Sequence, residues 1–209
     1  MRKQQLILIV IVVALIVSVF ALLVMRQPKS SSQSSETVTI STDQPSEEPL
    51  KKAGYVWRGG PDDPKKITIQ SINVDTYIQK VGVDQNSQIA VPTNINLTGW
   101  FVEGARPGEA GLSVIDGHFD GYSSDGVFAR LTEVKADDEV RIEMGNGEMR
   151  TFRVKRVTTV KTEAAAAELF SQDPTISSQL SLITCGGAFD DSKRSYDQRI
   201  IVVTERIDS

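Results

Sequence analysis

From Lys65 onward, the chain consists of short runs in which apolar and polar residues alternate, and this period of two constrains its fold more than any other feature. Alternation puts apolar side chains on one face of a strand and polar side chains on the other. Two such runs, residues 140–144 and residues 152–154, flank a turn that contains Asn146-Gly147. Asn-Gly between alternating runs is a strong hairpin signal. Many short strands at regular spacing predict an all-β fold, either a barrel or a sandwich.

Only a few segments have helical character. Residues 163–170 include four consecutive alanines, and we expect a short helix there, capped by Thr162 and ended before Pro174. Residues 127–134 predict a second short helix. The sequence has no internal repeat and no phosphate-binding glycine loop, since the glycines near Asn146 belong to the hairpin turn. The roughly 145 residues of this part are enough for one closed domain with its own core.

The N-terminal end of the chain has a different character. Residues 6–25 contain Ser18 as their only polar side chain, and a helix of this length spans about 30 Å, the thickness of a bilayer core. We expect residues 1–5 to be a cytoplasmic tail and residues 6–25 a single transmembrane anchor in the cell membrane. The rest of the chain is then extracellular, because the segment after the apolar run is acidic and serine-rich. A cleaved signal peptide is the alternative, but the apolar run is long for one and no small-residue cleavage site follows it.

Residues 26–64 separate this anchor from the alternating part of the chain. They are rich in serine and proline and poor in apolar residues, so we expect a flexible extracellular linker. The exception is the segment Tyr55-Val56-Trp57-Arg58, whose aromatic side chains could pack back onto the domain as a lid.

Charge and cysteine content exclude several kinds of protein. The net charge is -4 and no basic stripe accumulates anywhere, which argues against a nucleic-acid partner. A single cysteine excludes an intramolecular disulfide and a structural zinc site built from Cys and His, which needs about four ligands. The acidic run Asp137-Asp138-Glu139 fits a turn before a strand better than a calcium site. We therefore predict no metal site and no cofactor.

The chain has one cysteine and one histidine, so any chemistry that combines the two must use Cys185 and His118. Cys185 ends an apolar run and is followed by two glycines, which leave room for another backbone beside the thiol. His118 follows another predicted strand, and Arg199 opens the final one. Taken singly, each has an ordinary alternative: a buried core thiol, a polar surface histidine and an arginine at a sheet edge.

Taken together, the three residues resemble the active site of sortases, the membrane-anchored cysteine transpeptidases of monoderm bacteria. The signatures are Gly117-His118, Leu182-Ile183-Thr184-Cys185, and Asp197-Gln198-Arg199 before an apolar strand. The resemblance covers about residues 65–207 and implies that residues 65–209 form a closed catalytic β-barrel of about eight strands. Ser181 stands where the family usually has Thr, and Leu-Ile-Thr-Cys-Gly-Gly resembles the class F branch in particular.

The resemblance implies that the Cys185 thiolate attacks the bond between Thr and Gly of a sorting signal similar to Leu-Pro-x-Thr-Gly and forms a thioester. His118 would protonate the departing amine and then activate the incoming one. Arg199 would hold the substrate and stabilise the oxyanion, and Thr184 would bind or position the substrate. The resemblance also implies that only a small, correctly protonated fraction of the Cys–His pair is active. The implied partners are secreted proteins with C-terminal sorting signals and an amine of the peptidoglycan or its precursor.

Two other functions stay open on the sequence. An extracytoplasmic cysteine peptidase would use water as the acceptor, although papain-like enzymes place Cys before His in the chain and add an Asn or Asp. A surface β-barrel that only binds a partner would need no chemistry, and Cys185 would then be a buried, inert thiol.

Overall fold

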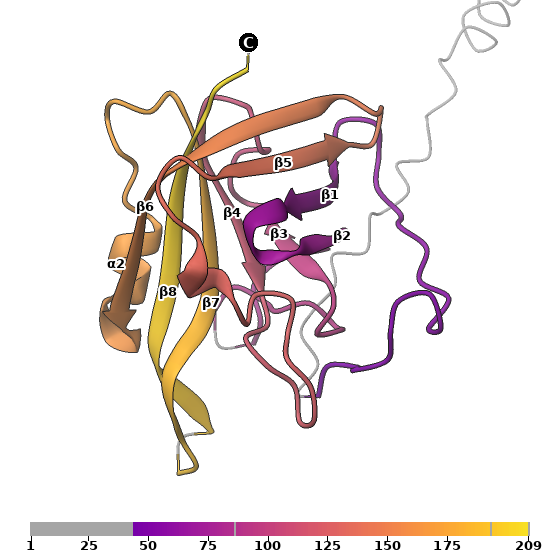
Figure 1. Ribbon diagram of the computed structural model, residues 1–209, viewed down its shortest axis with the longest axis vertical. Helices are drawn as coiled ribbons and strands as arrows, with labels where there is room; N and C mark the ends of the chain where they lie inside the picture. Colours follow the sequence, from indigo (N-terminus) through magenta and orange to yellow (C-terminus); the bar gives the residue numbers. More distant parts are fainter. Residues whose placement is uncertain (1–43, 86, 193, 209) are drawn as a thin grey trace, which may run out of the picture. The chain divides into compact units, whose positions relative to one another are not determined.

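The computed structural model describes residues 44–85, 87–192 and 194–208. Within these ranges, eight strands form a closed barrel and one short α-helix lies beside it (Figure 1). The strands are β1 (Pro64–Ile69), β2 (Val74–Val81), β3 (Thr98–Phe101), β4 (Gly111–Gly117), β5 (Glu139–Met144), β6 (Met149–Lys161), β7 (Ser178–Asp190) and β8 (Ser195–Arg206). The helical elements are the 3-10 turns η1 (Gln70–Ile72), η2 (Leu131–Glu133) and η3 (Thr162–Ala164), and the helix α2 (Ala165–Leu169).

The order of strands around the barrel is β1-β2-β3-β4-β7-β8-β6-β5, and β5 closes the ring by pairing with β1. The pairs β2–β3 and β4–β7 are parallel, and the other pairs are antiparallel. Closure satisfies the backbone groups that an open sheet would leave at its edges. The prediction of an all-β fold is confirmed in its barrel form, and the sandwich alternative does not apply.

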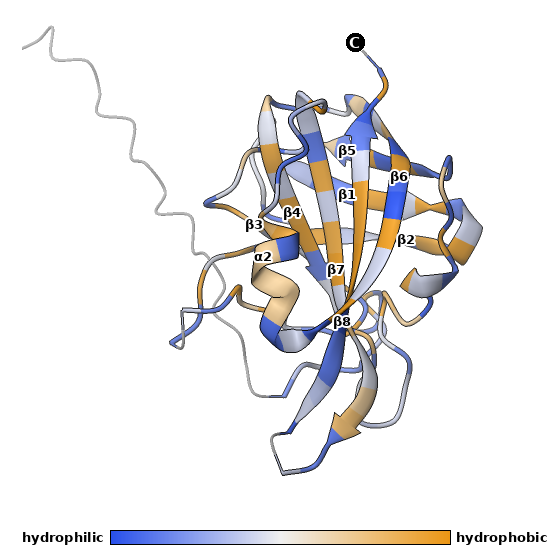
Figure 2. Ribbon diagram, turned by 90° about the vertical axis from the view of Figure 1, so that its left-hand side faces the viewer, coloured by the Kyte–Doolittle hydropathy of each residue, from blue (hydrophilic) through white to orange (hydrophobic). Residues whose placement is uncertain are grey.

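Alternation along the strands divides the apolar side chains between two clusters, and Figure 2 shows the resulting stripes along β7 and β8. The larger cluster contains Ile142, Phe152, Leu182 and Val202, all fully buried. The opposite face of β4, β7 and β8 carries a second cluster, to which α2 contributes Leu169. Each fully buried aliphatic or aromatic side chain contributes about 1.5–3 kcal/mol, so both faces stabilise the strands that carry the predicted catalytic residues.

The parallel pairing of β4 with β7 decides where those residues meet. Parallel strands end at the same edge of a sheet, and they can be joined only by a long crossover, which here contains β5, β6, η3 and α2. The register joins Asp116 to Ile183. Cys185 lies two positions further along β7, and His118 directly follows β4, two positions after Asp116, so the pairing brings them to the same level of the barrel.

The local predictions had mixed outcomes. The hairpin between β5 and β6 is confirmed, because Gly147 has a φ of 86° and its N–H donates to the carbonyl of Met144. The helix predicted at residues 163–170 is present as η3 followed by α2, but the predicted cap is wrong, since the Thr162 hydroxyl donates to the carbonyl of Tyr196 instead. The second predicted helix is reduced to the single 3-10 turn η2.

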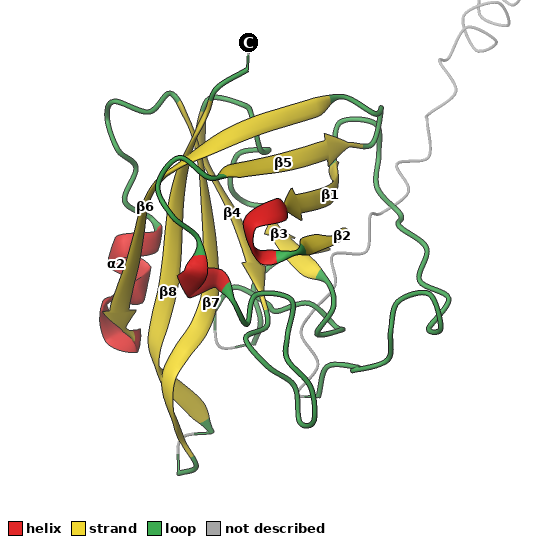
Figure 3. Cartoon of the chain, viewed as in Figure 1, coloured by secondary structure: helices red, strands yellow, loops and turns green. Residues whose placement is uncertain are grey.

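The predicted linker is described from residue 44 onward, and this part runs along the barrel before it enters β1 (Figure 3). Ser46 forms a parallel bridge with Asn94, and the Tyr55 ring packs on the Tyr77 ring with 5.5 Å between centroids. The segment is therefore attached more closely than its polar composition predicts. The predicted tail and anchor, residues 1–25, lie outside the described residues. No helix in the described part is long and apolar enough to cross a membrane.

Candidate active site

Cys185 and Arg199 are direct partners in the antiparallel register of β7 and β8. Directly paired residues point to the same face of a sheet, so the thiol and the guanidinium emerge side by side. Two residues further into each strand, Ile183 and Ile201 belong to the apolar cluster on this face. Cys185 is half-buried at the end of that cluster, which places a reactive group where the packed surface meets solvent.

A hydrogen bond fixes the position of His118 relative to Cys185. Thr184 Oγ1 donates to the carbonyl of Gly117 at 2.7 Å, which joins the residue before the thiol to the residue before the imidazole. Thr184 is 3% exposed, so its hydroxyl is committed to the protein. This geometry assigns Thr184 to holding β4 and β7 in register, and direct contact between Thr184 and a substrate stays a prediction.

The His118 ring is held by the chain that precedes β3. Its Nε2 lies 2.7 Å from the carbonyl oxygen of Pro92. A carbonyl can only accept, so Nε2 carries the proton and Nδ1 has the lone pair in the neutral ring. Burial lowers the pKa of His118, and the Pro92 carbonyl and the Asp120 carboxylate oppose that shift. The neutral imidazole is therefore the favoured form at pH 7.

Burial also raises the pKa of the Cys185 thiol. The charge of Arg199 acts in the opposite direction, while the carboxyl groups of Asp120 and Asp116 raise the pKa further. With ordinary pKa values of about 6.5 and about 8.5, only about 1% of the pair would be thiolate and imidazolium. Both shifts make that fraction smaller, in agreement with the small active fraction that the resemblance to sortases implies.

The Arg199 guanidinium is oriented by oxygens around it. Its Nη1 donates to Thr162 Oγ1 at 3.0 Å and to the carbonyls of Tyr196 and Gln198 at 2.9 and 2.8 Å. Its Nη2 has only a longer contact of 3.4 Å with Ser195 Oγ within the described part of the chain. The permanent charge is thus held in place while Nη2 retains donor capacity for a bound anion or carbonyl.

Aromatic side chains connect the loop after His118 to β8. The Tyr196 hydroxyl donates to the Asp120 carboxylate, and the Tyr196 ring lies 5.3 Å from the Phe119 ring and 5.2 Å from the Phe189 ring. Burial and the neighbouring Asp120 raise the pKa of Tyr196 to about 12, so its hydroxyl stays a donor. This contact links the histidine loop to the strand that carries Arg199.

A buried carboxyl lies two residues before His118. Asp116 is 7% exposed, and its Oδ1 has no hydrogen-bond partner among the described residues. A Cβ on Gly99 of the neighbouring strand would lie 2.3 Å from this oxygen, so a larger residue there would force the Asp116 side chain to move. Burial raises the pKa of Asp116 well above its usual range, which favours the protonated carboxyl.

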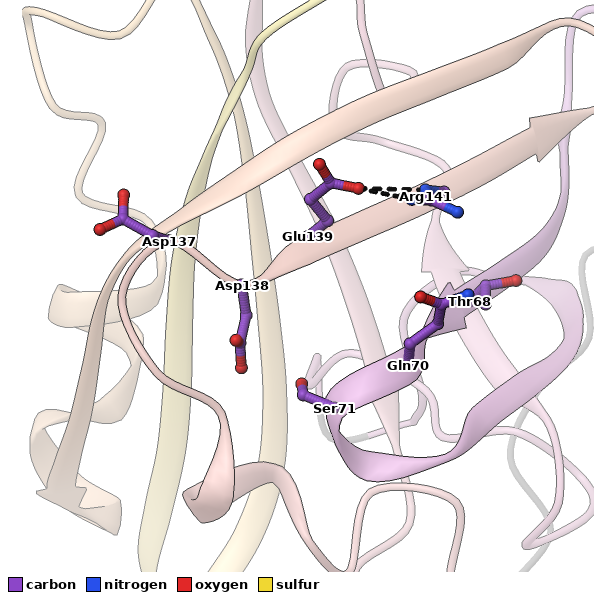
Figure 4. Close-up of a pocket in the computed structure, with 7 residues that line it drawn as sticks. All are labelled: Thr68, Gln70, Ser71, Asp137, Asp138, Glu139 and Arg141. Atoms are coloured by element: carbon purple, nitrogen blue, oxygen red, sulfur yellow. Dashed lines mark hydrogen bonds and ion pairs between the residues drawn. The ribbon is translucent and has the colours of Figure 1, made fainter.

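The acidic run lies at the turn before β5, as predicted, and its last residue, Glu139, begins that strand. Its three carboxylates line a cavity of about 360 Å³ but point in different directions (Figure 4). Glu139 pairs with Arg141 at 2.6 Å, and Asp138 accepts from the backbone N–H of Lys135. In the described ranges, no three His, Cys, Asp or Glu side chains are grouped so that they could hold a metal ion.

Several contacts of the site were not predicted from the sequence. They are the Pro92 carbonyl on the imidazole, the Thr162 hydroxyl on Arg199, and the pair formed by Asp120 and Tyr196. The first two depend on which loops meet and leave no local signal in the sequence. Asp120 carried a detectable signal, because a carboxylate two residues after the only histidine is placed to act on its charge.

A sequence model of the sortase domain matches residues 67–207. Comparison with curated protein sequences gave no significant match. Among solved structures, the chain is similar to a lid mutant of sortase A from Corynebacterium diphtheriae, with 25% identity, coverage of 73% of this chain and 74% of that chain, and a TM-score of 0.53. Sortase C-1 from Actinomyces oris shares 25% identity over 70% of this chain and 76% of that chain, with a TM-score of 0.51. The sortase D5 transpeptidase from Clostridium perfringens supports the fold alone, with 21% identity over 76% and 86% of the two chains and a TM-score of 0.52.

Proposed function

The chain belongs to the sortase family of cysteine transpeptidases, and we propose that it cleaves a sorting signal similar to Leu-Pro-x-Thr-Gly between Thr and Gly and transfers the acyl group to a cell-wall amine. The observation that supports this most is the strand register. Cys185 and Arg199 are direct partners, and the Thr184–Gly117 hydrogen bond brings His118 to the same level. The chain has no second cysteine or histidine for this chemistry.

In the first step, the Cys185 thiolate attacks the carbonyl carbon of the Thr residue of the signal. A C–S bond forms and the carbonyl π electrons move to oxygen, where Arg199 stabilises the negative charge. The tetrahedral intermediate then re-forms its C=O bond and breaks the C–N bond. The His118 imidazolium protonates the departing amine from Nδ1, because its Nε2 is bound to the Pro92 carbonyl.

In the second step, an amine of the cell wall or its precursor attacks the thioester. Neutral His118 takes the proton from that amine, and the C–S bond breaks to regenerate the thiolate. Dividing the exchange of one amide for another into two steps replaces one high barrier by two lower ones. The low population of the thiolate–imidazolium pair limits the rate of the first step.

The proposal is tested with the full-length chain in detergent, a Leu-Pro-x-Thr-Gly peptide, and a glycine peptide as the added amine. Formation of an amide product that depends on the amine supports the transpeptidase. Hydrolysis that is unaffected by the amine would instead identify a peptidase, and a lack of both reactions together with an inert thiol would identify a binding module. Cys185→Ala should abolish cleavage, and His118→Ala should lower it by about 10²–10⁴-fold.

The location and subclass are further parts of the proposal. The apolar run at residues 6–25 supports a single-pass anchor in the cell membrane with the barrel outside, which membrane fractionation and external protease digestion would test. The run Leu-Ile-Thr-Cys-Gly-Gly supports a class F affinity. The lid role of residues 55–58 stays a prediction.

A further inference from the structure

Residues 46–47, here called the clamp, lie against two loops that meet at His118. The first is the loop before β3, whose Pro92 carbonyl contacts the imidazole. The second is the loop that begins at His118 and leads away from β4. In Figure 1 the clamp belongs to the indigo part of the chain, which passes these loops before it reaches β1.

The clamp adds a short strand-like pairing to the loop before β3. The Ser46 N–H donates to the Thr93 carbonyl at 2.8 Å, and the Ile95 N–H donates to the Ser46 carbonyl at 2.9 Å. These contacts form the parallel bridge between Ser46 and Asn94. Thr93, whose carbonyl accepts from Ser46, directly follows Pro92. The pairing therefore fixes the backbone whose Pro92 carbonyl contacts the His118 imidazole.

The side chain of the clamp holds the second loop. The Glu47 carboxylate accepts hydrogen bonds from the backbone N–H groups of Tyr122 and Ser123 and from the Ser123 hydroxyl, the last at 2.6 Å. These bonds, with that of the Ser123 hydroxyl the strongest, lower the pKa of Glu47 and keep it ionised. A Cβ at Gly121 would lie 2.6 Å from Glu47 Oε1, so the loop approaches the carboxylate where it has no side chain.

Backbone bonds carry this restraint from the second loop to His118. The Gly126 N–H donates to the Phe119 carbonyl at 3.0 Å, and the Phe128 N–H donates to the His118 carbonyl at 2.9 Å. The Val127 N–H donates to the Ile95 carbonyl at 2.8 Å, which joins this loop to the first one. After the clamp, Pro49 and Leu50 line a cavity of about 440 Å³.

We propose that the clamp positions the His118 imidazole, with Glu47 as a positioning residue that holds the histidine loop against the loop before β3. The groups that face the imidazole are the Pro92 carbonyl and the Asp120 carboxylate, with Cys185 at the same level on β7. Loosening the two loops would let water reach the ring and would lengthen its contact with Pro92. The expected loss of peptide cleavage rests on the proposed function, whereas the expected change in the pKa of His118 does not.

The test compares Glu47→Ala with Glu48→Ala in the full-length chain. Both changes remove one carboxylate, but the Glu48 side chain is directed to Lys52 at 3.4 Å and not to the histidine loop. His118 is the only histidine, so the ring-proton NMR signals of a protein without a histidine tag report its titration directly. We expect Glu47→Ala to raise the pKa of His118 toward its ordinary value, because burial, which lowers this pKa, is the larger effect and the weakened Pro92 contact opposes the rise only in part. Glu48→Ala should leave the pKa of His118 unchanged. The clamp proposal is overturned if both variants titrate like the wild type.

Peptide cleavage supplies the second measurement. Glu47→Ala should lower kcat about tenfold with KM changed less than twofold, because the displaced imidazole no longer lies where it can protonate the departing amine, and this loss outweighs the larger imidazolium fraction. Ser46→Pro, which removes the N–H bonded to Thr93 without changing charge, should have the same two effects. If the wild-type chain cleaves no signal peptide but Glu47→Ala still shifts the pKa of His118, the proposed function fails and the clamp stands. Cleavage by the wild type with equal kcat in the Glu47 and Glu48 variants would overturn the clamp alone.

Discussion

Replacing Asp116 with asparagine should change how the stability of the protein depends on pH. Asp116 is almost fully buried, its Oδ1 has no partner among the described residues, and a Cβ at Gly99 would lie 2.3 Å from that oxygen. Burial therefore raises the pKa of the folded carboxyl well above its usual range. Asparagine has nearly the same shape and does not titrate, so Asp116→Asn isolates this one ionisation.

The sign follows from the protons that each state binds. Below about pH 3.9, the carboxyl is protonated in both the folded and the unfolded chain. Above that pH, the unfolded carboxyl ionises while the folded one keeps its proton. The free energy of unfolding then falls by about 1.4 kcal/mol for each pH unit until the pH reaches the raised folded pKa. The contribution of Asp116 is thus complete in acid and is lost as the pH rises.

Urea unfolding of both proteins, followed by tryptophan fluorescence between pH 4 and pH 7, measures this effect. The buried amide of the variant brings a constant cost of about 1–3 kcal/mol, because one donor lacks a partner, but this cost does not change with pH. Up to the folded pKa of Asp116, the difference in free energy of unfolding should therefore move in favour of Asp116→Asn by about 1.4 kcal/mol per pH unit. A difference that stays constant across this range would refute the buried, protonated carboxyl.

The remaining predictions concern the site itself. The rate at which iodoacetamide modifies Cys185 should rise with pH and reach its midpoint above about pH 8.5, because burial raises the pKa of the thiol. Arg199→Ala should move this midpoint to still higher pH, because the charge of Arg199 lowers the pKa. A midpoint below pH 8 in the wild type would contradict this prediction. Thr184→Val should lower the free energy of unfolding by about 1–3 kcal/mol, measured by urea unfolding, because the buried Gly117 carbonyl loses its partner. Gly126→Ala should reduce peptide cleavage at least tenfold, because the new Cβ would overlap the His118 carbonyl, and unchanged kcat would show that the loop adapts.

The features that the sequence predicted correctly are those with a local signal. Alternation in runs such as residues 140–144 determines which face of each strand is buried, and Asn146-Gly147 determines a hairpin. A single cysteine and a single histidine leave one possible pairing for Cys/His chemistry. The structure adds the reason why they can meet, since β4 and β7 are parallel neighbours with Asp116 opposite Ile183.

The features that the sequence did not predict depend on contacts between distant segments. Thr162 is a residue type that often caps a helix, but its hydroxyl donates to the Tyr196 carbonyl and accepts from Arg199 instead. The serine-rich region before the barrel lacks the apolar residues that would predict packing, yet Ser46 and Glu47 are attached through backbone and carboxylate hydrogen bonds. Hydropathy does not register such bonds, because their partners lie in loops far along the chain.

The formation of a thioester on Cys185 is the most direct test of the proposed chemistry. The full-length protein is mixed with a Leu-Pro-x-Thr-Gly peptide without an added amine, quenched in acid, and its intact mass is measured. We predict that the mass of the protein increases by the mass of the acyl group that ends at the Thr of the peptide. A glycine peptide added before the quench should remove this adduct, and Cys185→Ala should not form it. A wild-type protein that consumes the peptide without this adduct, or an adduct that persists in Cys185→Ala, would contradict a mechanism through Cys185.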